Sequence, residues 1–157
     1  MTRVLTIVAA VASITIAAAQ APPNFAGKWA LVPDPNAQPG MGGGLGTEAT
    51  ITQDASTLTI TRTTQMGTFT SNYKLDGSES RNVLTIQGNS IDQLSTTKWD
   101  AGKLLVNTKM DFGGNVVETK MVMALDPASG NLLVETTRPD FQGGGAPITT
   151  KMAYKKN

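Results

Sequence analysis

The chain contains no cysteine and no histidine among its 157 residues. Without them there is no thiolate nucleophile, no disulfide, and neither the commonest general base nor the commonest metal ligand. These absences exclude the usual zinc sites and the catalytic triads that depend on either residue. We therefore expect a protein without cofactor or metal that is not an enzyme, because any catalysis would fall to Asp, Glu, Ser, Tyr, Lys or Arg alone.

Charge and aromatic side chains are also sparse, at 16% and 5% of the residues, and the formal net charge is only +1. A chain this close to neutral lacks the basic excess that drives binding to nucleic acid or to an anionic membrane. We expect neither as a partner.

The long uncharged run of the chain lies at its start. Met1-Thr2-Arg3 supplies a positive charge, and residues 4–19 are uncharged and rich in small side chains, as in a secretory signal peptide. The run is too short and too rich in alanine for a comfortable membrane span. Small residues permit cleavage after Ala19 or after Ala21, and we favour Ala19 because the later cut would put Pro22 next to the scissile bond.

This reading predicts a signal peptide over residues 1–19 and one domain over residues 20–157. Cleavage leaves 138 residues with 12 basic and 12 acidic side chains. A domain of this size buries enough surface for a core without disulfides. We expect it to be exported to the periplasm or the extracellular space, with no integral membrane insertion of the mature chain.

Beyond residue 24 the apolar residues alternate with polar ones, and turn residues separate the segments, which indicates strands. The predicted strands are 27–32, 47–53, 57–63, 67–75, 80–87, 93–99, 103–110, 115–125, 131–138 and 148–155. Short connections favour pairing of each strand with the next. The predicted fold is all-β, a single antiparallel up-and-down meander closed into a barrel of 8–10 strands.

The connections differ between the two ends of this barrel. One end, here called the top, receives the long Gly/Pro-rich loops over residues 33–46, 64–66, 88–92, 111–114 and 139–147. The other end, the bottom, receives short turns over residues 54–56, 76–77, 100–102 and 126–130, each with an aspartate near its start. A tightly closed end opposite a loose one predicts a cup.

Large rings are predicted to close the bottom of the cup. Trp29 lies near the start of an upward strand, whereas Tyr73, Trp99 and Tyr154 lie near the ends of downward strands. All four side chains fall at the bottom on this reading, where they can plug the base.

The top carries the candidate ligand-binding residues. Arg62 and Arg138 have inward parity near the rim, where two guanidinium groups suit a carboxylate or a phosphate; the alternative is that both bend out to water. Met41, Met66, Phe112 and Phe141 form an apolar set on the top loops, with Met110 at the level of the arginines. The predicted interior lining is Ile60, Val106, Met121, Met123, Val134 and Met152.

Three other patterns carry no site. Asp54, Asp76, Asp100 and Asp126 are explained by turn chemistry without calcium, which needs six or more oxygens. The glycines of residues 40–46 lack the lysine and the following helix of a phosphate loop. Glu118 and Glu135 have outward parity and nothing marks them as a glycosidase pair.

The segment Phe25-Ala26-Gly27-Lys28-Trp29 resembles the Gly-x-Trp opening of lipocalins and fatty-acid-binding proteins. Residues 24–155 are similar to small exported bacterial proteins of this lipocalin-like kind, including the turn at residues 73–77 and the hairpin at residues 98–104. The resemblance implies that Gly27 starts the first strand, that Trp29 packs across the closed end, and that a basic residue of the last strand covers it. Lys151 and Lys155 are the candidates for that residue.

The sequence departs from the family pattern in two places. Residues 33–46 are too rich in proline and glycine for the helical lid of fatty-acid-binding proteins. Their Arg-x-Tyr carboxylate clamp is replaced by residues 151–154, Lys-Met-Ala-Tyr. These departures concern the ligand more than the fold.

We expect a non-catalytic extracytoplasmic protein that holds a small apolar or amphipathic molecule in the barrel. The alternative is a filled barrel that serves as a protein-interaction or cell-envelope module through its Gly-rich top loops. The two differ in whether inward side chains fill the interior.

Overall fold

The computed structural model describes residues 21–34, 44–64, 67–86, 88–140 and 144–157. The predicted signal peptide and both possible cleavage points lie at or before the edge of this part, and the signal peptide stays a prediction. No helix in the described ranges is long and apolar enough to cross a membrane.

Ten antiparallel strands form one sheet. They are β1 (Gly27–Leu31), β2 (Glu48–Gln53), β3 (Thr57–Thr64), β4 (Gly67–Lys74), β5 (Ser80–Ile86), β6 (Asn89–Asp100), β7 (Lys103–Phe112), β8 (Asn115–Leu125), β9 (Leu132–Arg138) and β10 (Ile148–Lys156).

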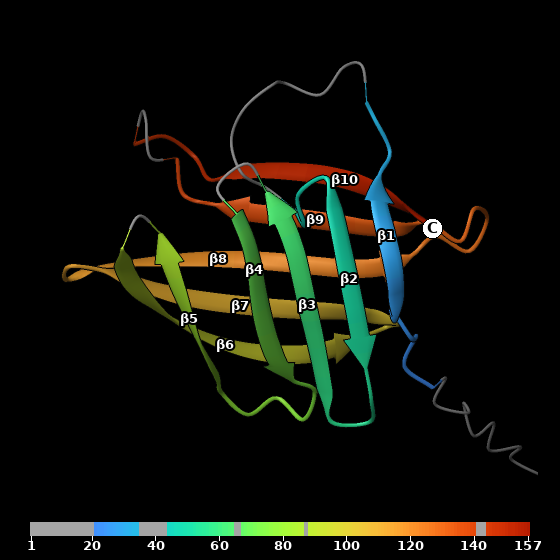
Figure 1. Ribbon diagram of the computed structural model, residues 1–157, viewed down its shortest axis with the longest axis horizontal. Coiled ribbons are helices and arrows are strands. Elements are labelled where there is room, and N and C mark those ends of the chain that lie inside the picture. The colour runs from blue at the N-terminus through green and yellow to red at the C-terminus, as the bar shows by residue number, and fades with distance from the viewer. Residues whose placement is uncertain (1–20, 35–43, 65–66, 87, 141–143) are drawn as a thin grey trace, which may run out of the picture.

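The strand order is β4-β3-β2-β1-β10-β9-β8-β7-β6-β5, so each strand pairs with its sequence neighbours and β1 pairs with β10. The sheet curls on itself: β1 to β4 form one wall, and β6 to β10 form the opposite wall and run across their direction (Figure 1). The predicted all-β antiparallel meander is confirmed, as a nearly closed barrel of ten strands.

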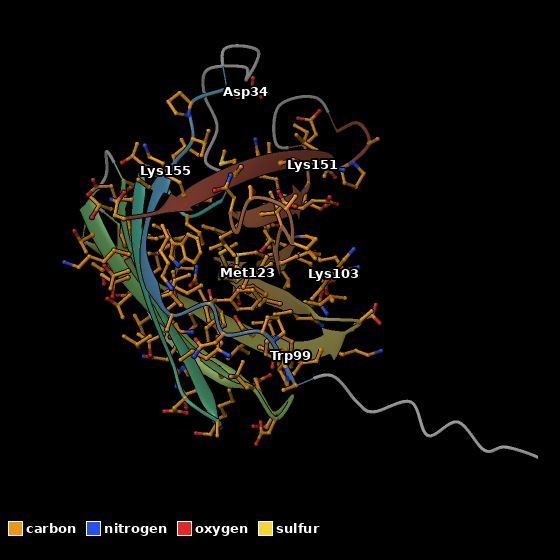
Figure 2. All side chains as sticks on the ribbon, turned by 90° about the vertical axis from the view of Figure 1, so that its right-hand side faces the viewer. Asp34, Trp99, Lys103, Met123, Lys151 and Lys155 are labelled. Carbon is orange, nitrogen blue, oxygen red and sulfur yellow. The ribbon has the colours of Figure 1, made fainter. Side chains whose placement is uncertain are left out.

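Alternation explains which side chains enter the barrel. In β3, Leu58 and Ile60 are buried, while the intervening Thr59 is partly exposed on the outside. Side chains of successive strand residues point to opposite faces, so a period of two places one apolar set inside. Figure 2 shows Met123 between the two walls and Lys103 at the edge of the molecule.

The core is a single cluster that both walls share. Its buried members are Phe25, Trp29, Leu45, Ala49, Ile51, Leu58, Ile60, Leu104, Val106, Met123, Leu132, Val134 and Tyr154. Contributions from β1 to β3 on one side and β7 to β10 on the other tie the two walls together.

Two strands are longer than the sequence predicted. β6 begins at Asn89, so Asp92 lies inside the strand and pairs with Val83 rather than lying in a top loop. β7 reaches Phe112, which pairs with Asn115 across a two-glycine turn at Gly113-Gly114. Both glycines have positive φ, 65° and 96°, the geometry of the tightest hairpins. Asn and Asp residues at these positions favour loops in the sequence. In the structure the turns are tight enough for strand pairing to continue through these residues.

The N-terminal segment before β1 closes the bottom of the barrel. Phe25 is fully buried and stacks on Trp99, with ring centroids 5.9 Å apart. The indole Nε1 of Trp29 donates to the carbonyl of Phe25 at 2.9 Å. Gln53 clamps the segment from the other side, because its amide accepts from the Phe25 N–H and donates to the carbonyl of Pro23. In Figure 2 Trp99 lies beside this segment.

The basic residue that covers Trp29 is Lys156. Its ammonium lies 5.5 Å from the Trp29 ring centroid, a cation–π contact. The expectation of Lys151 or Lys155 was wrong, because both have outward parity and Lys151 pairs with Glu135 on the outer face. Gly27 makes room for the lysine: a Cβ there would lie 2.4 Å from the Lys156 Cε, and its φ of +149° disfavours other residues.

Two adjacent leucines test the core assignment. Leu132 is fully buried and Leu133 is 43% exposed. We expect Leu132→Ala to lower the free energy of unfolding by about 2–5 kcal/mol, because it leaves a cavity in the core. The matched Leu133→Ala should lower it by well under that amount. Urea denaturation of both variants measures the difference, and equal losses would contradict the inward and outward assignment of β9.

Candidate functional site

The inner surface of the barrel has an apolar part and a polar part. Next to the apolar core, β4, β5 and β6 bring hydroxyl and amide side chains inside, and six polar residues there are buried. They are Ser71, Ser80, Asn82, Gln93, Ser95 and Thr97. On the neighbouring strand Thr108 continues this polar part, 2.8 Å from Ser95 between hydroxyl oxygens.

Arg62 joins this surface from β3. Its side chain points into the barrel, as those of its cross-strand neighbours do. Arg62 pairs with Ala49 of β2 on one side and with Phe69 of β4 on the other, and Ala49 pairs in turn with Trp29 of β1. Its guanidinium carbon lies 6.0 Å from the Phe69 ring centroid. Its Nε is buried and has no hydrogen-bond partner among the described residues. A buried donor left without a partner costs about 1–3 kcal/mol, more for a charged group, so this atom is a candidate ligand contact.

Arg138 lies on the same face of β9, two residues beyond Thr136, and pairs with Ile148. Its Nε is buried too. The charged residues on the inward rows of the described strands are therefore Arg62, Arg138 and, at the bottom, Lys156. No Asp or Glu of these ten strands shares an inward row with them. The inner surface is cationic.

The barrel is not closed by backbone pairing between β4 and β5, and side chains do this work in the lower half of the seam. The amide of Asn82 accepts from the Asn72 N–H at 2.7 Å and donates to the Asn72 carbonyl at 3.0 Å. Asn82 thus imitates the backbone of a neighbouring strand. Ser80 accepts from the Lys74 N–H at 2.7 Å, and Thr97 donates to the Lys74 carbonyl.

Above Asn72 the seam holds a slot of about 210 Å³. No hydrogen bond joins β4 to β5 here among the described residues. The lining combines inward and outward side chains: Thr68, Phe69, Thr70, Ser71, Val83, Leu84, Thr85 and Gln93. Side chains of both faces line it because it lies between two unpaired strand edges. One of them, Phe69, also lies beside the Arg62 guanidinium.

The end of the β1–β2 connection folds into the interior. Leu45 is 1% exposed and belongs to the core. Its N–H donates to the Tyr154 hydroxyl at 2.8 Å, and this hydroxyl lies 3.1 Å from the Gly46 carbonyl that accepts from it. The Gly44 N–H donates to Thr136 at 3.2 Å. Residues 44–46, here called the strap, therefore link β9 and β10 from above.

Glycine is required on both sides of Leu45. A Cβ on Gly44 would lie 2.5 Å from the Met152 sulfur and 2.6 Å from the Tyr154 hydroxyl, and one on Gly46 would lie 2.4 Å from the Thr63 carbonyl oxygen. Both glycines also have positive φ. The glycines of this segment serve close packing of the strap.

The predicted site residues occupy different environments. Val134 is buried in the core and Met121 packs against it, so both touch protein neighbours. Met110 faces inward, and its sulfur accepts from the Gln93 amide at 3.3 Å. Phe112 lies at the β7–β8 hairpin tip, 43% exposed. Met41, Met66 and Phe141 lie outside the described residues.

The predicted aromatic base is built differently from the expectation in one respect. Trp29 and Tyr73 belong to or pack against the core, and Trp99 stacks on Phe25. Tyr154 is buried as well, but its hydroxyl binds the strap at the other end of the barrel.

The aspartates of the bottom turns bind their own turns. The Asp54 carboxylate accepts from the N–H groups of Ser56 and Thr57, and these bonds hold its pKa below the usual value. Asp76 accepts from the hydroxyl of Ser78 and Asp126 from the hydroxyl of Ser129, and these bonds lower the pKa of both carboxyls too. Within the described ranges no group of three or more acidic side chains is placed to hold a metal ion.

Sequence reasoning missed Asn82, Leu45 and Phe25. Asn82 alternates correctly for an inward residue, but nothing in a single sequence marks it as the partner of a strand ten residues away. Leu45 lies between two glycines outside the strands, and Phe25 comes just before the Gly-x-Trp segment. An isolated apolar residue in such a loop can indicate a side chain that is buried in the core.

No protein-family model matches the chain, and no curated protein matches it either.

Asn82 offers a test of the seam. We expect Asn82→Leu to lower the free energy of unfolding by about 1–3 kcal/mol, because the Asn72 backbone groups lose both partners. Hydrogen exchange of the Asn72 amide should accelerate more than that of core amides. Asn107→Leu is the control, since Asn107 is an exposed asparagine on β7. Unchanged Asn72 exchange in Asn82→Leu would contradict closure by the side-chain amide.

Tyr154 offers a pH test. Burial raises the pKa of its hydroxyl, although the Leu45 N–H and the charge of Arg62 act in the opposite direction. Because the folded pKa is raised, the unfolded chain releases this proton first, and stability is lost as pH rises above about 10. Alkaline denaturation should show this loss for the wild type and less of it for Tyr154→Phe. Identical slopes of stability against pH would refute the assignment.

Proposed function

We propose that the protein is an extracytoplasmic binding protein for a small amphipathic molecule with an anionic group. The observation that carries the proposal is Arg62, an inward guanidinium whose buried Nε has no partner among the described residues. Carboxylates and phosphates bind arginine through charge-assisted, often bidentate hydrogen bonds. Arg62 would hold the anionic group, with Arg138 as a second cation of the inner surface.

The charge distribution supports an anion. All carboxylates of the described strands have outward parity, and three of them pair with cations on the outer face: Asp92 with Arg81, Glu118 with Lys109 and Glu135 with Lys151. No carboxylate on the inward rows of the described strands competes for Arg62. A ligand anion would therefore meet an uncompensated positive charge in a partly dehydrated wall, where attraction is less screened than in water.

The surroundings of Arg62 support an amphipathic molecule. Phe69 and Ile60 give apolar contacts beside it, while Ser71 and Gln93 offer hydrogen-bonding groups on the neighbouring strands. Binding sites of small molecules combine a mostly apolar lining with few placed polar groups. The lower interior is occupied by the core cluster, so the ligand lies above it rather than among Val106, Met123 and Val134.

A filled barrel acting as an interaction or envelope module is the second candidate. The packed core favours it, since four of the six predicted lining residues are nearly completely buried against protein neighbours. The exposed Phe112 at the β7–β8 tip offers one apolar contact for a partner. In this case Arg62 would bind only water or ions.

Native mass spectrometry tests the first candidate against the second. The mature protein, purified without detergent from its own type of cell, should carry an extra mass that disappears on denaturation. Arg62→Met should abolish that mass or weaken binding at least about ten-fold, as expected for loss of a charged hydrogen bond of about 1.5–3 kcal/mol.

Arg81→Met is the matched control, because Arg81 is paired with Asp92 on the exposed outer face. It should leave the bound mass unchanged. An apo wild-type protein, or a bound molecule retained by Arg62→Met, would refute the role of Arg62 and favour the interaction module.

A further inference from the structure

Described segments cover part of each end of the barrel. At the bottom, the segment with Phe25 covers Trp99 and is clamped by Gln53. At the top, the strap places Leu45 in the core and binds Tyr154 and Thr136.

The side wall differs in its upper half, where β4 and β5 are not paired. The lower seam is joined by Asn82, Ser80 and Thr97, but the upper seam has no cross-strand hydrogen bond among the described residues. The slot lies in this upper half, and the Phe69 ring that lines it is the ring beside the Arg62 guanidinium.

The slot edges are also uncharged. Its eight lining residues include five with hydroxyl or amide side chains and three that are apolar, and none carries charge. Such uncharged edges suit the uncharged part of a ligand, while the anionic end of the same ligand binds the nearby Arg62. Charged edges, which proteins commonly use to protect free strands, flank only the closed half, at Lys74 and Arg81.

We infer that the upper half of the β4–β5 seam is a ligand subsite: the anionic end reaches Arg62 sideways through the wall, and the body of the ligand remains in the slot. This rests on the proposed function of Arg62. A volume of about 210 Å³ is below the roughly 300–1,000 Å³ that encloses a drug-sized ligand. The subsite therefore takes part of an elongated molecule with a terminal carboxylate or phosphate, and its far end stays in solvent.

A tail-labelled fatty acid tests the subsite. The probe is dodecanoic acid with a dansyl amide at the carbon farthest from the carboxylate, titrated by fluorescence into the mature wild-type protein. Dansyl dodecylamine, which lacks the carboxylate, is the control ligand. We expect the labelled acid to bind at least ten-fold more tightly than the control ligand without a carboxylate. The dansyl group of the bound acid should remain accessible to iodide quenching.

Bulky substitutions separate the side route from the top. Thr70→Trp and Val83→Trp narrow the slot from its outer side, and each should weaken binding and slow association at least ten-fold. Val116→Trp is the matched control, because Val116 is an exposed valine on the outer face of β8 and does not line the slot. It should bind the probe as the wild type does. Thermal denaturation verifies that each variant is folded.

The outcomes distinguish the two ideas. If Arg62→Met loses the probe but the two slot variants bind it normally, the side route is refuted and the proposed function stands. If the slot variants weaken binding and the control does not, the subsite is supported. A wild type that binds acid and amine equally, or neither, overturns the anionic site and this inference with it.

Discussion

A ten-stranded antiparallel meander has two free edges, and their closure is the constraint on which the rest of this structure depends. Here the edges are β4 and β5. Unpaired strand edges cost hydrogen bonds and invite association with other chains. The protein closes only the lower half, with the side-chain amide of Asn82 in place of a peptide group. The remaining half is the slot, so the opening in the wall is a direct consequence of how the meander ends.

The incomplete closure between β4 and β5 also explains where polar side chains lie inside the barrel. The buried polar residues come from β4, β5 and β6, on either side of the incomplete seam, whereas the core cluster draws its buried residues from β1 to β3, β7 to β10, the N-terminal segment and the strap. Buried polar side chains there find hydrogen-bond partners across the seam, which lowers the cost of burying them. In the row from Trp29 to Phe69, small Ala49 separates the large indole from Arg62, so the cation lies where the apolar core gives way to the polar part.

The sequence was sufficient for what depends on local alternation. It predicted ten strands, their antiparallel order and the inward parity of Arg62, because strand side chains follow a period of two. It was insufficient where contact is between distant segments. Lys156 instead of Lys151 or Lys155 covers Trp29 because of the β1–β10 register, which no turn fixes. The strap, the Phe25 anchor and the Asn82 closure likewise depend on folding of loops and edges in three dimensions.

Near-neutrality of the whole chain conceals an unequal distribution of charge. The carboxylates lie in turns or in pairs on the outer face, and exposed pairs such as Lys109 with Glu118 each stabilise the fold by only about 0–1 kcal/mol. Their larger effect is to neutralise the outside. With acidic groups kept out of the inward rows of the described strands, Arg62 has no carboxylate of those rows to neutralise it. Low-dielectric walls focus such a field along an opening. A neutral surface with a cationic interior is the charge distribution that the proposed binding of an anion inside the barrel requires.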